Sequence, residues 1–327
     1  MEVKVLFKAI VLFIIGLVCL IFGGDWFVDG ATGIARKFHL PEILIGATVV
    51  SIGTTLPEVM VSTTSALKGI GSIAYGNAIG SIICNTALIS AITITAMPGL
   101  VDRKSMKTPV IFFFVTFALY AFAAYILGTF TRPFGLLMLV IFLAYMFVTI
   151  RQMKNNPAPE KAEKEQHEED MSMGKAILLL VVGAALIAVG ANLLVDNGTF
   201  IAKELGVPET VIALTFVALG TSLPELVTAI TSLMKGHGAL SLGNIIGANL
   251  FNLVLVCGVS ITLAPFDLPN AATFLGRNAS LTLDLPVACL VMLIMTMPAL
   301  VKGKLMRWQG ITLLAIYAVF CIIQFTM

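Results

Sequence analysis

The sequence predicts an all-α polytopic membrane protein with ten transmembrane helices in two inverted five-helix repeats. Composition predicts the class: 58% of the 327 residues are hydrophobic and only 12% are charged, whereas soluble domains are about 25% charged. The apolar residues also form runs of about 18 or more, long enough to span a bilayer. An internal repeat predicts the arrangement. This composition excludes a soluble enzyme, and the net charge of +2 gives no indication of nucleic acid as a partner.

The internal repeat is visible when Gly23–Asn85 is aligned without a gap with Gly190–Asn252. The two stretches share about 26 of about 63 residues, far more than chance allows. Each contains a short motif, GTTLPE ending at Glu58 and GTSLPE ending at Glu225. Biased composition explains matched Leu and Val but not matched Gly, Pro, Asp, Glu and Asn. Such shared positions include Asp29/Asp196, Pro41/Pro208, Glu42/Glu209, Thr54/Thr221, Asn77/Asn244, Gly80/Gly247 and Asn85/Asn252.

Runs of about 20 apolar residues place five helices in each half of the chain. Residues 1–152 are expected to hold helices from about Leu6 into the thirties, then at Pro41–Lys68, Ser72–Ala96, Pro109–Leu127 and Phe134–Ile150. Residues 174–327 are expected to hold Ala176–Lys203, Glu209–Met234, Leu240–Leu263, Leu281–Val301 and Leu305–Thr326. The repeated regions cover about 41–98 and 208–263. The charged stretch 153–173 reads as a solvated linker.

The orientation follows from the helix count and the basic residues. An odd number of helices in each repeat makes the second enter the membrane from the opposite side, as in many secondary transporters. Lys and Arg are more than twice as frequent in the connections on the linker side as on the other side. The positive-inside rule therefore places residues 153–173 in the cytoplasm and both termini outside the cell membrane.

Four polar side chains recur at matched depths in the repeats: Glu58, Asn85, Glu225 and Asn252. Inverted repeats would bring them together at the midplane of the bilayer. Carboxylates there are costly and mark functional sites. Two side by side repel each other unless a cation or a proton neutralises them. The alternative is a structural helix kink with a paired, protonated Glu.

The neighbouring residues supply only oxygen ligands, which Ca²⁺ prefers, and no His or Cys joins the cluster, which argues against Zn²⁺, copper or an iron–sulfur centre. Thr54 precedes Glu58 by one turn on the same helix face. The proline of each motif is expected to break the helix and free backbone carbonyls. Asn77, Asn244 and Asn249 are expected to hydrogen-bond between helices rather than bind ions. The other candidate ligands are Ser51, Thr54, Thr55, Ser81, Ala218, Thr221 and Ser222.

At these motifs the sequence resembles the sodium/calcium exchangers of the cation/calcium exchanger superfamily. The two GT[ST]LPE segments, each followed by a GN-x-I-G segment, are similar to the two alpha repeats of that family. The resemblance implies exchange of several Na⁺ for one Ca²⁺, with the middle sites formed by Glu58, Asn85, Glu225 and Asn252. It also implies ligands from Thr54, Thr221 and the backbone of Ser51 and Ala218. The first and sixth helices would slide past a core made by the other eight. No enzymatic activity, cofactor, nucleic acid or obligatory protein partner is implied.

The sequence departs from the family pattern at several positions. Prokaryotic members often carry Asp where this chain has Asn252, as animal exchangers do. Ala248 replaces a serine that often ligates Na⁺, and Ile82 stands where Asn is common. The short linker has no calcium-sensing domain, which is typical of the minimal prokaryotic form.

Two other functions stay open. The first is a calcium/proton or potassium-dependent exchanger of the same superfamily, although the proton-coupled branch usually carries GNxxE in place of GTxxPE. The second is a cation channel, since paired carboxylates can line a pore. Gly-rich inverted repeats around one buried site favour an exchanger.

Overall fold

The structure is a computed structural model that describes residues 2–155, 171–204, 220, 222–270 and 273–326. Within these ranges nine helices are long and apolar enough to cross a membrane, and a shorter apolar helix spans Leu223–Met234. Large apolar side chains are exposed on outer helix faces, among them Ile111, Phe147 and Ile322. Such extensive exposed apolar surface is expected where helices face lipid.

The first half of the chain consists of α1 (Glu2–Lys37), α2 (Glu42–Ile45), α3 (Ser51–Leu67), α4 (Gly71–Cys84), α5 (Ala91–Ala96), α6 (Arg103–Phe122) and α7 (Arg132–Asn155). The second half consists of α8 (Met173–Glu204), α10 (Leu223–Met234), α11 (Gly238–Phe251), α12 (Cys257–Leu263), α13 (Leu285–Lys302) and α14 (Arg307–Thr326). Wide π-helical turns extend these helices at Gly46–Val50, Asn85–Ser90, Ala123–Leu127, Asn252–Val256 and Ser280–Asp284.

Because π-helical turns join α2 to α3, α4 to α5 and α11 to α12, each of these pairs forms one continuous span. Nine spans lie where the sequence predicts them, although the fourth begins earlier than expected. Pro109 lies inside α6, which starts at Arg103 because Asp102 caps it, accepting from Lys104 N at 3.0 Å. The first part of the expected seventh helix, 209–219, lies outside the described residues.

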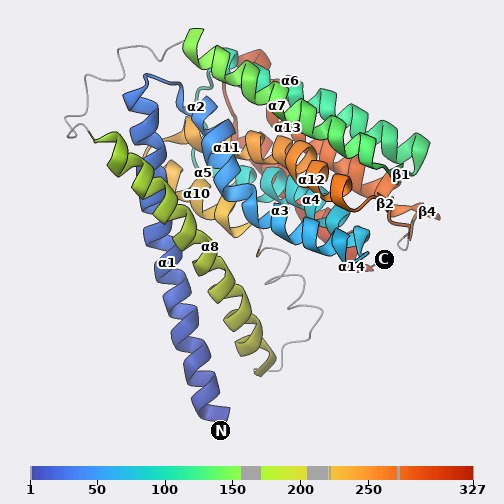
Figure 1. Cartoon of the computed structure of the whole chain (residues 1–327), viewed down its shortest axis with the longest axis horizontal. Helices are drawn as coiled ribbons and strands as arrows, with labels where there is room; N and C mark the ends of the chain where they lie inside the picture. The colour runs from blue at the N-terminus through green and yellow to red at the C-terminus, as the bar shows by residue number, and fades with distance from the viewer. Residues whose placement is uncertain (1, 156–170, 205–219, 221, 271–272, 327) are drawn as a thin grey trace.

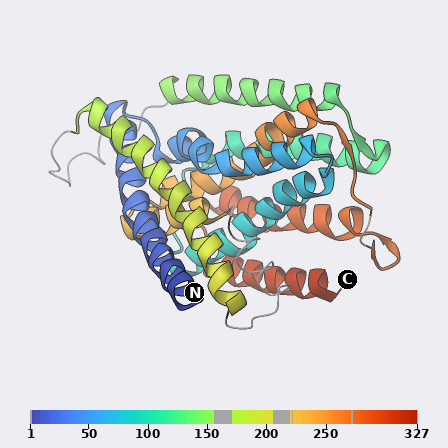
Figure 2. The same ribbon diagram turned by 60° about the horizontal axis from the view of Figure 1, so that its bottom comes forward.

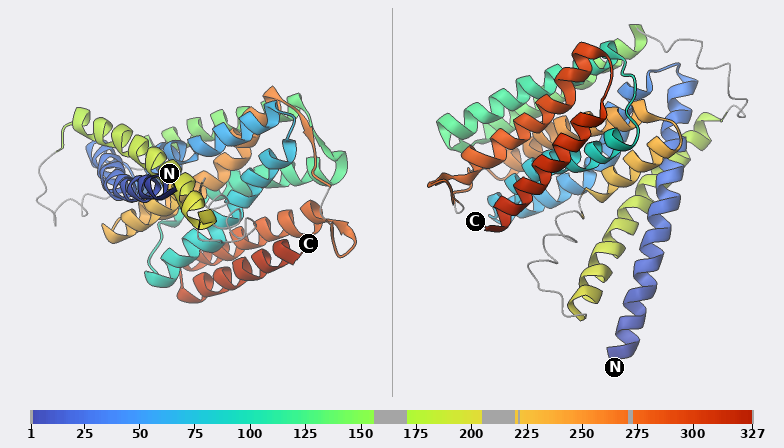
Figure 3. Two further views of the ribbon diagram at one scale, coloured as in Figure 1. Left: turned by 90° about the horizontal axis from the view of Figure 1, so that it is seen from below. Right: turned by 180° about the vertical axis from the view of Figure 1, so that it is seen from behind.

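Helices α1 and α8 lie side by side and extend away from the other helices (Figures 1 and 3). They run antiparallel, because a Cβ added at Gly16 would lie 2.9 Å from the Gly190 oxygen, whereas one added at Gly183 would lie 2.8 Å from the Gly23 oxygen. Glycines at these positions allow the two backbones to approach closely. In the sequence repeat Gly16 corresponds to Gly183 and Gly23 corresponds to Gly190. The operation that relates the two repeats therefore converts each of these two contacts into the other.

The other helices form a bundle with α11 near its centre (Figure 2). Every described residue from Leu240 to Phe251 is buried. A Cβ at Gly243 would overlap the Ile43 carbonyl, and one at Gly247 would lie 2.6 Å from Ala47 Cα. The span formed by α2 and α3 therefore packs directly on α11, which belongs to the other half of the chain.

Short strands lie at the end of the bundle where α7 begins (Figure 1). Strand β1 (Thr129–Phe130) pairs antiparallel with β2 (Phe266–Asp267), and this pair joins the two halves. Strands β3 (Thr273–Phe274) and β4 (Arg277–Asn278) form a small hairpin. These strands were not predicted from the sequence, because each has only two residues and gives no periodic signal.

Candidate cation site

The four predicted site residues lie on four neighbouring elements. Glu58 is in α3 and Glu225 is in the first turn of α10. Asn85 and Asn252 each begin a π-helical turn. Helix α3 packs against the turn that begins at Asn252, and α10 packs against the turn that begins at Asn85. Each acidic helix therefore contacts the asparagine turn of the other half, and at most 1% of any of the four residues is exposed.

These buried polar groups lack hydrogen-bond partners within the described part of the chain. Both carboxylate oxygens of Glu58 and of Glu225 are unpaired, as are Asn85 Oδ1, Asn85 Nδ2 and Asn252 Oδ1. Buried polar groups normally have partners, so such a concentration requires an explanation. No Lys, Arg or His is among the buried residues of the described chain, and the charges of Glu58 and Glu225 lie close enough to repel each other. The missing countercharge must come from cations or protons.

The five described hydroxyl candidates, Ser51, Thr54, Thr55, Ser81 and Ser222, are all buried. Thr55 Oγ1 and Ser222 Oγ have no partner in the described chain, so their oxygens are available to a ligand. The Ser51 hydroxyl shares its single proton between the Gly46 and Asn244 backbone oxygens, at 2.7 and 2.9 Å, and the Thr54 hydroxyl donates to Asn244 Oδ1. Ala218 and Thr221 lie outside the described residues.

The three asparagines expected to join helices do so. Asn244 on α11 accepts at its backbone oxygen from Ser51 Oγ at 2.9 Å and at Oδ1 from Thr54 Oγ1 at 3.2 Å. Asn77 on α4 donates to the Glu58 backbone oxygen at 3.2 Å and to Ser62 Oγ at 2.8 Å.

The third of them, Asn249, donates to Thr86 Oγ1 at 2.7 Å. Thr86 follows Asn85 in the chain, so this bond fixes the turn that carries Asn85. All three asparagines therefore hold the backbone around the site.

The expected helix break at the first proline is wrong. Helix α3 runs unbroken from Ser51 to Leu67 with Pro57 inside it. The helix is instead widened about two to three turns before Pro57, at Gly46–Val50, where Ser51 Oγ donates to the Gly46 oxygen at 2.7 Å. The close packing of this segment on α11 leaves no room for the chain to kink away. In the second half, α10 begins at Leu223, so Pro224 lies in the first turn, where its missing N–H costs nothing.

The π-helical turns at Asn85 and Asn252 were missed by the sequence reasoning. Each inserts an extra residue in a turn at the same position of the two repeats, and such turns are rare and frequently functional. Matched asparagines identified the residues, but nothing in the local sequence distinguishes a π-turn from an α-turn.

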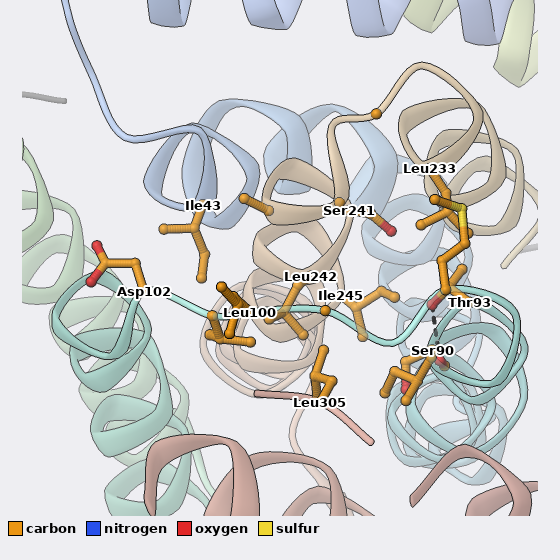
Figure 4. Close-up of a pocket in the computed structure, with 17 residues that line it drawn as sticks. Ile43, Ser90, Thr93, Leu100, Asp102, Leu233, Ser241, Leu242, Ile245 and Leu305 are labelled. Atoms are coloured by element: carbon orange, nitrogen blue, oxygen red, sulfur yellow. Dashed lines mark hydrogen bonds between the residues drawn. The ribbon is translucent and has the colours of Figure 1, made fainter. Parts of the chain in front are cut away.

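A cavity of about 270 Å³ lies apart from these groups, between α2, α5 and the start of α11 (Figure 4). None of the predicted ligands lines it, and its wall is mostly apolar, with Leu100, Leu242 and Ile245 prominent. Ser90, the last residue of the turn that begins at Asn85, reaches its edge and accepts from Thr93 Oγ1 at 2.9 Å. The side-chain oxygen atoms of this lining come from Ser90, Thr93, Asp102 and Ser241, none of which belongs to the predicted cation site.

The ligand chemistry around Glu58 and Glu225 favours alkali and alkaline-earth cations. Within the described residues no three His, Cys, Asp or Glu side chains are grouped as a metal cluster. The available donors are two carboxylates, two amides and several hydroxyls, which are all oxygen ligands. Hard cations such as Ca²⁺ bind to this kind of set.

Comparison with known proteins places the chain in a family. Residues 8–151 and 175–326 match the sodium/calcium exchanger protein family. An uncharacterized membrane protein of Methanocaldococcus jannaschii is 33% identical over 308 residues, covering 94% of this chain and 95% of the relative. Sodium/calcium exchanger MaX1 of Methanosarcina acetivorans is 29% identical over 347 residues, covering 95% of this chain and 97% of its own.

Solved structures agree with this result. A structure of the sodium–calcium exchanger NCX_Mj soaked with Na⁺ and Ca²⁺ matches 95% of this chain and 97% of its own, at 31% identity and a TM-score of 0.78. The family match spans nearly the whole chain, and both the sequence relatives and the solved structure cover more than nine-tenths of it. This multi-pass membrane protein therefore belongs to the sodium/calcium exchanger family, whose members are transporters rather than enzymes.

Proposed function

We propose that this chain exchanges Na⁺ for Ca²⁺ by alternating access at one site formed by Glu58, Asn85, Glu225 and Asn252. Hydroxyls of Thr55 and Ser222 add ligands, and Ser81, Thr54, Thr221 and the backbone of Ser51 and Ala218 complete the set. The observation that carries this proposal is the pair of fully buried glutamates with all four carboxylate oxygens unpaired in the described chain.

Charge balance explains why the two ions would compete. Two ionised carboxylates carry up to two negative charges, and one Ca²⁺ or at least two Na⁺ neutralise them. Without either, the buried charges are costly. Because both ions would use the same oxygens, Ca²⁺ leaves when Na⁺ enters, and this coupling is what makes an exchanger.

The two inverted repeats, 1–152 and 174–327 around the linker 153–173, supply the alternation in this proposal. The antiparallel contacts of α1 with α8 support it, because they exchange under the repeat. Helices α3 and α10 also end alike: Lys68 and Lys235 have φ of −81° and −85°, and the following Gly69 and Gly236 have φ of +78° and +81°. The family resemblance supports sliding of α1 and α8 past the other helices.

The proposed orientation has the linker in the cytoplasm and both termini outside. Single cysteines introduced near residue 160 and near the N-terminus, in a background without the five native cysteines, test this orientation. An impermeant thiol reagent should label only the terminal position in intact cells. Labelling of the linker alone would reverse the assignment.

Calcium uptake into proteoliposomes with imposed ion gradients tests the exchange itself. An outward Na⁺ gradient should drive saturable Ca²⁺ uptake. Protonophores should not abolish this uptake, and a K⁺ gradient should not substitute for the Na⁺ gradient. Uptake driven by a proton gradient would indicate a calcium/proton exchanger, and a requirement for K⁺ would indicate a potassium-dependent one. Non-saturating flux without a counter-ion would indicate a channel.

A further inference from the structure

An ion pair joins the long helix α1 to the bundle close to the end of α10. Lys235, the residue after α10, places its Nζ 2.7 Å from Asp29 Oδ1 and 3.4 Å from Asp25 Oδ1. The same ammonium donates to the Asp25 backbone oxygen at 3.0 Å. The candidate cation site does not use any of these three residues. Their contact connects one of the two helices expected to slide with one expected to stay in place.

The internal repeat contains a second copy of this pair. Asp29 corresponds to Asp196 on α8, and Lys235 corresponds to Lys68 after α3. In the structure Asp196 and Lys68 are both exposed, and neither forms an ion pair within the described chain. The two lysines nevertheless follow helix ends of the same backbone geometry. The chain therefore presents two equivalent pairs, of which one is formed.

The packing of α1 on α10 is also one-sided. A Cβ at Gly24 would lie 2.7 Å from Val227 Cγ1 and 2.8 Å from Thr231 Oγ1, so α1 sits directly on α10 beside the ion pair. The contacts between α1 and α8 exchange under the repeat, but the contacts of this pair of helices with the bundle do not. The structure is thus one of two states that the repeat would make equivalent.

We propose that the two aspartate–lysine pairs are alternating locks: Asp29–Lys235 holds the present state, and Asp196–Lys68 holds the state in which α8 has taken the place of α1. This rests on the proposed alternating access. A two-fold axis in the membrane plane exchanges the repeats and the two sides of the membrane together. The same operation that carries Asp29 to Asp196 therefore moves the closed contact to the opposite side.

The two locks differ in strength, and Asp29–Lys235 is the stronger of them. The position equivalent to Asp25 is Asn192, so Lys68 would meet one carboxylate where Lys235 meets two. The position equivalent to Gly24 is Ala191, whose methyl group would keep α8 further from α3. The present state is therefore the more stable of the two, and it is the more populated state when no ions are bound.

The test measures the populations of the two states by distances between spin labels at positions 14 on α1 and 319 on α14. Both positions are exposed, and the native cysteines are replaced. Asp29→Asn or Lys235→Gln should lower the ratio of the present state to the other by roughly twofold to fivefold, as expected for partly exposed ion pairs. Asp196→Asn or Lys68→Gln should raise it by a smaller factor. Asp29→Asn combined with Lys235→Gln should shift it no further than Lys235→Gln alone, because Lys235→Gln already removes the contacts with both aspartates.

His237→Gln is the matched control. His237 Nδ1 lies 2.8 Å from Glu42 Oε1 near the same end of α10, but it joins two elements outside the α1–α8 pair and corresponds to Ile70. This variant should leave the populations unchanged.

The proposal is overturned if Asp29→Asn and Asp196→Asn shift the populations in the same direction, or if neither shifts them. Because the distances are measured without ion flux, this outcome is independent of whether Na⁺ and Ca²⁺ are the ions exchanged. Conversely, Na⁺-driven Ca²⁺ uptake that persists while the populations do not respond would reject the locks and keep the proposed function.

Discussion

The same asparagine of the two repeats has different partners in the two halves of the molecule. Asn77 bonds within its own half, to Ser62 and to the Glu58 backbone. Asn244 bonds across the halves, to Ser51 and Thr54. Two of these partners are not repeated, because Ser62 corresponds to Ala229 and Ser51 corresponds to Ala218, whereas the equivalent of Thr54, Thr221, lies outside the described residues.

This difference shows what each asparagine contributes. A repeat supplies two copies of each side chain, but a copy makes the same hydrogen bond only if its partner is also repeated. Asn77 ties α4 to α3 through Ser62 and the Glu58 backbone, whereas Asn244 ties α11 to the helix of the other half that carries Glu58. The charged and amide groups of the candidate site are repeated without loss. Among the hydroxyl groups, Thr54 and Thr55 are repeated as Thr221 and Ser222, but alanine stands at the positions equivalent to Ser51, Ser62 and Ser81.

The largest expected effect on Ca²⁺ binding comes from the two glutamates, which lie at matched positions in the two halves. Glu58→Gln and Glu225→Gln each remove one of two buried charges that a divalent ion requires. Removing one partner of a buried charge pair costs about 3–5 kcal/mol, which corresponds to at least about 100-fold weaker Ca²⁺ binding. Calcium titration and flux should show equal losses for the two variants, with folding intact. A loss confined to one of them would break the equivalence of the halves.

A smaller loss is expected from Asn85→Leu and Asn252→Leu. Each removes one oxygen from the first residue of a π-helical turn while keeping a side chain of similar size. An unmatched polar interaction of this kind is worth about 1–3 kcal/mol, so Ca²⁺ affinity should fall by about tenfold in both variants. Isothermal titration with Ca²⁺ measures this loss. If Asn252→Leu binds Ca²⁺ as the unaltered protein does, Asn252 is not a ligand and its pairing with Asn85 is wrong.

The sequence predicted the repeated features well and the unrepeated ones poorly. Nine spans and the burial of Glu58, Asn85, Glu225 and Asn252 follow from apolar runs and from matched positions. The continuous helix α3 was not predicted, because Pro57 indicates a helix break and the sequence does not show the packing that keeps this helix unbroken. The bond between Ser51 and Asn244 and the ion pair of Lys235 connect distant segments, and a pattern of single residues does not show which of two copies is engaged.

The contact between the halves can be tested through one glycine of α11. Gly243→Ala would force its methyl group into the backbone of Ile43. Overpacking costs about 1–3 kcal/mol, so thermal unfolding in detergent should show a clear decrease for Gly243→Ala. An unchanged unfolding temperature would mean that α2 does not pack on α11 as closely as the structure has it.

The smallest expected effect addresses the asparagine comparison directly, through Ser51→Ala and Ser62→Ala. Both remove one buried hydroxyl that bonds to a repeated asparagine, and each should destabilise the fold by about 0.5–1.5 kcal/mol. Ser51 lies at the contact between the halves, one turn from Thr54 and about two turns from Glu58 on α3. Its loss should weaken the packing of α11 on α3. We expect Ca²⁺ binding to weaken by roughly twofold to threefold, because about 0.5 kcal/mol of the hydrogen-bond energy serves to hold α3, and with it Glu58, in position.

Ser62→Ala serves as the matched control, because Asn77 keeps its bond to the Glu58 backbone and no contact between the halves is lost. Its Ca²⁺ affinity should therefore be unchanged, although its unfolding temperature falls by a similar amount. Calcium titration and thermal unfolding of the two variants separate the two effects. Equal changes in Ca²⁺ affinity would show that the site responds to stability in general, and that the bond across the halves has no special role in holding Glu58 in place.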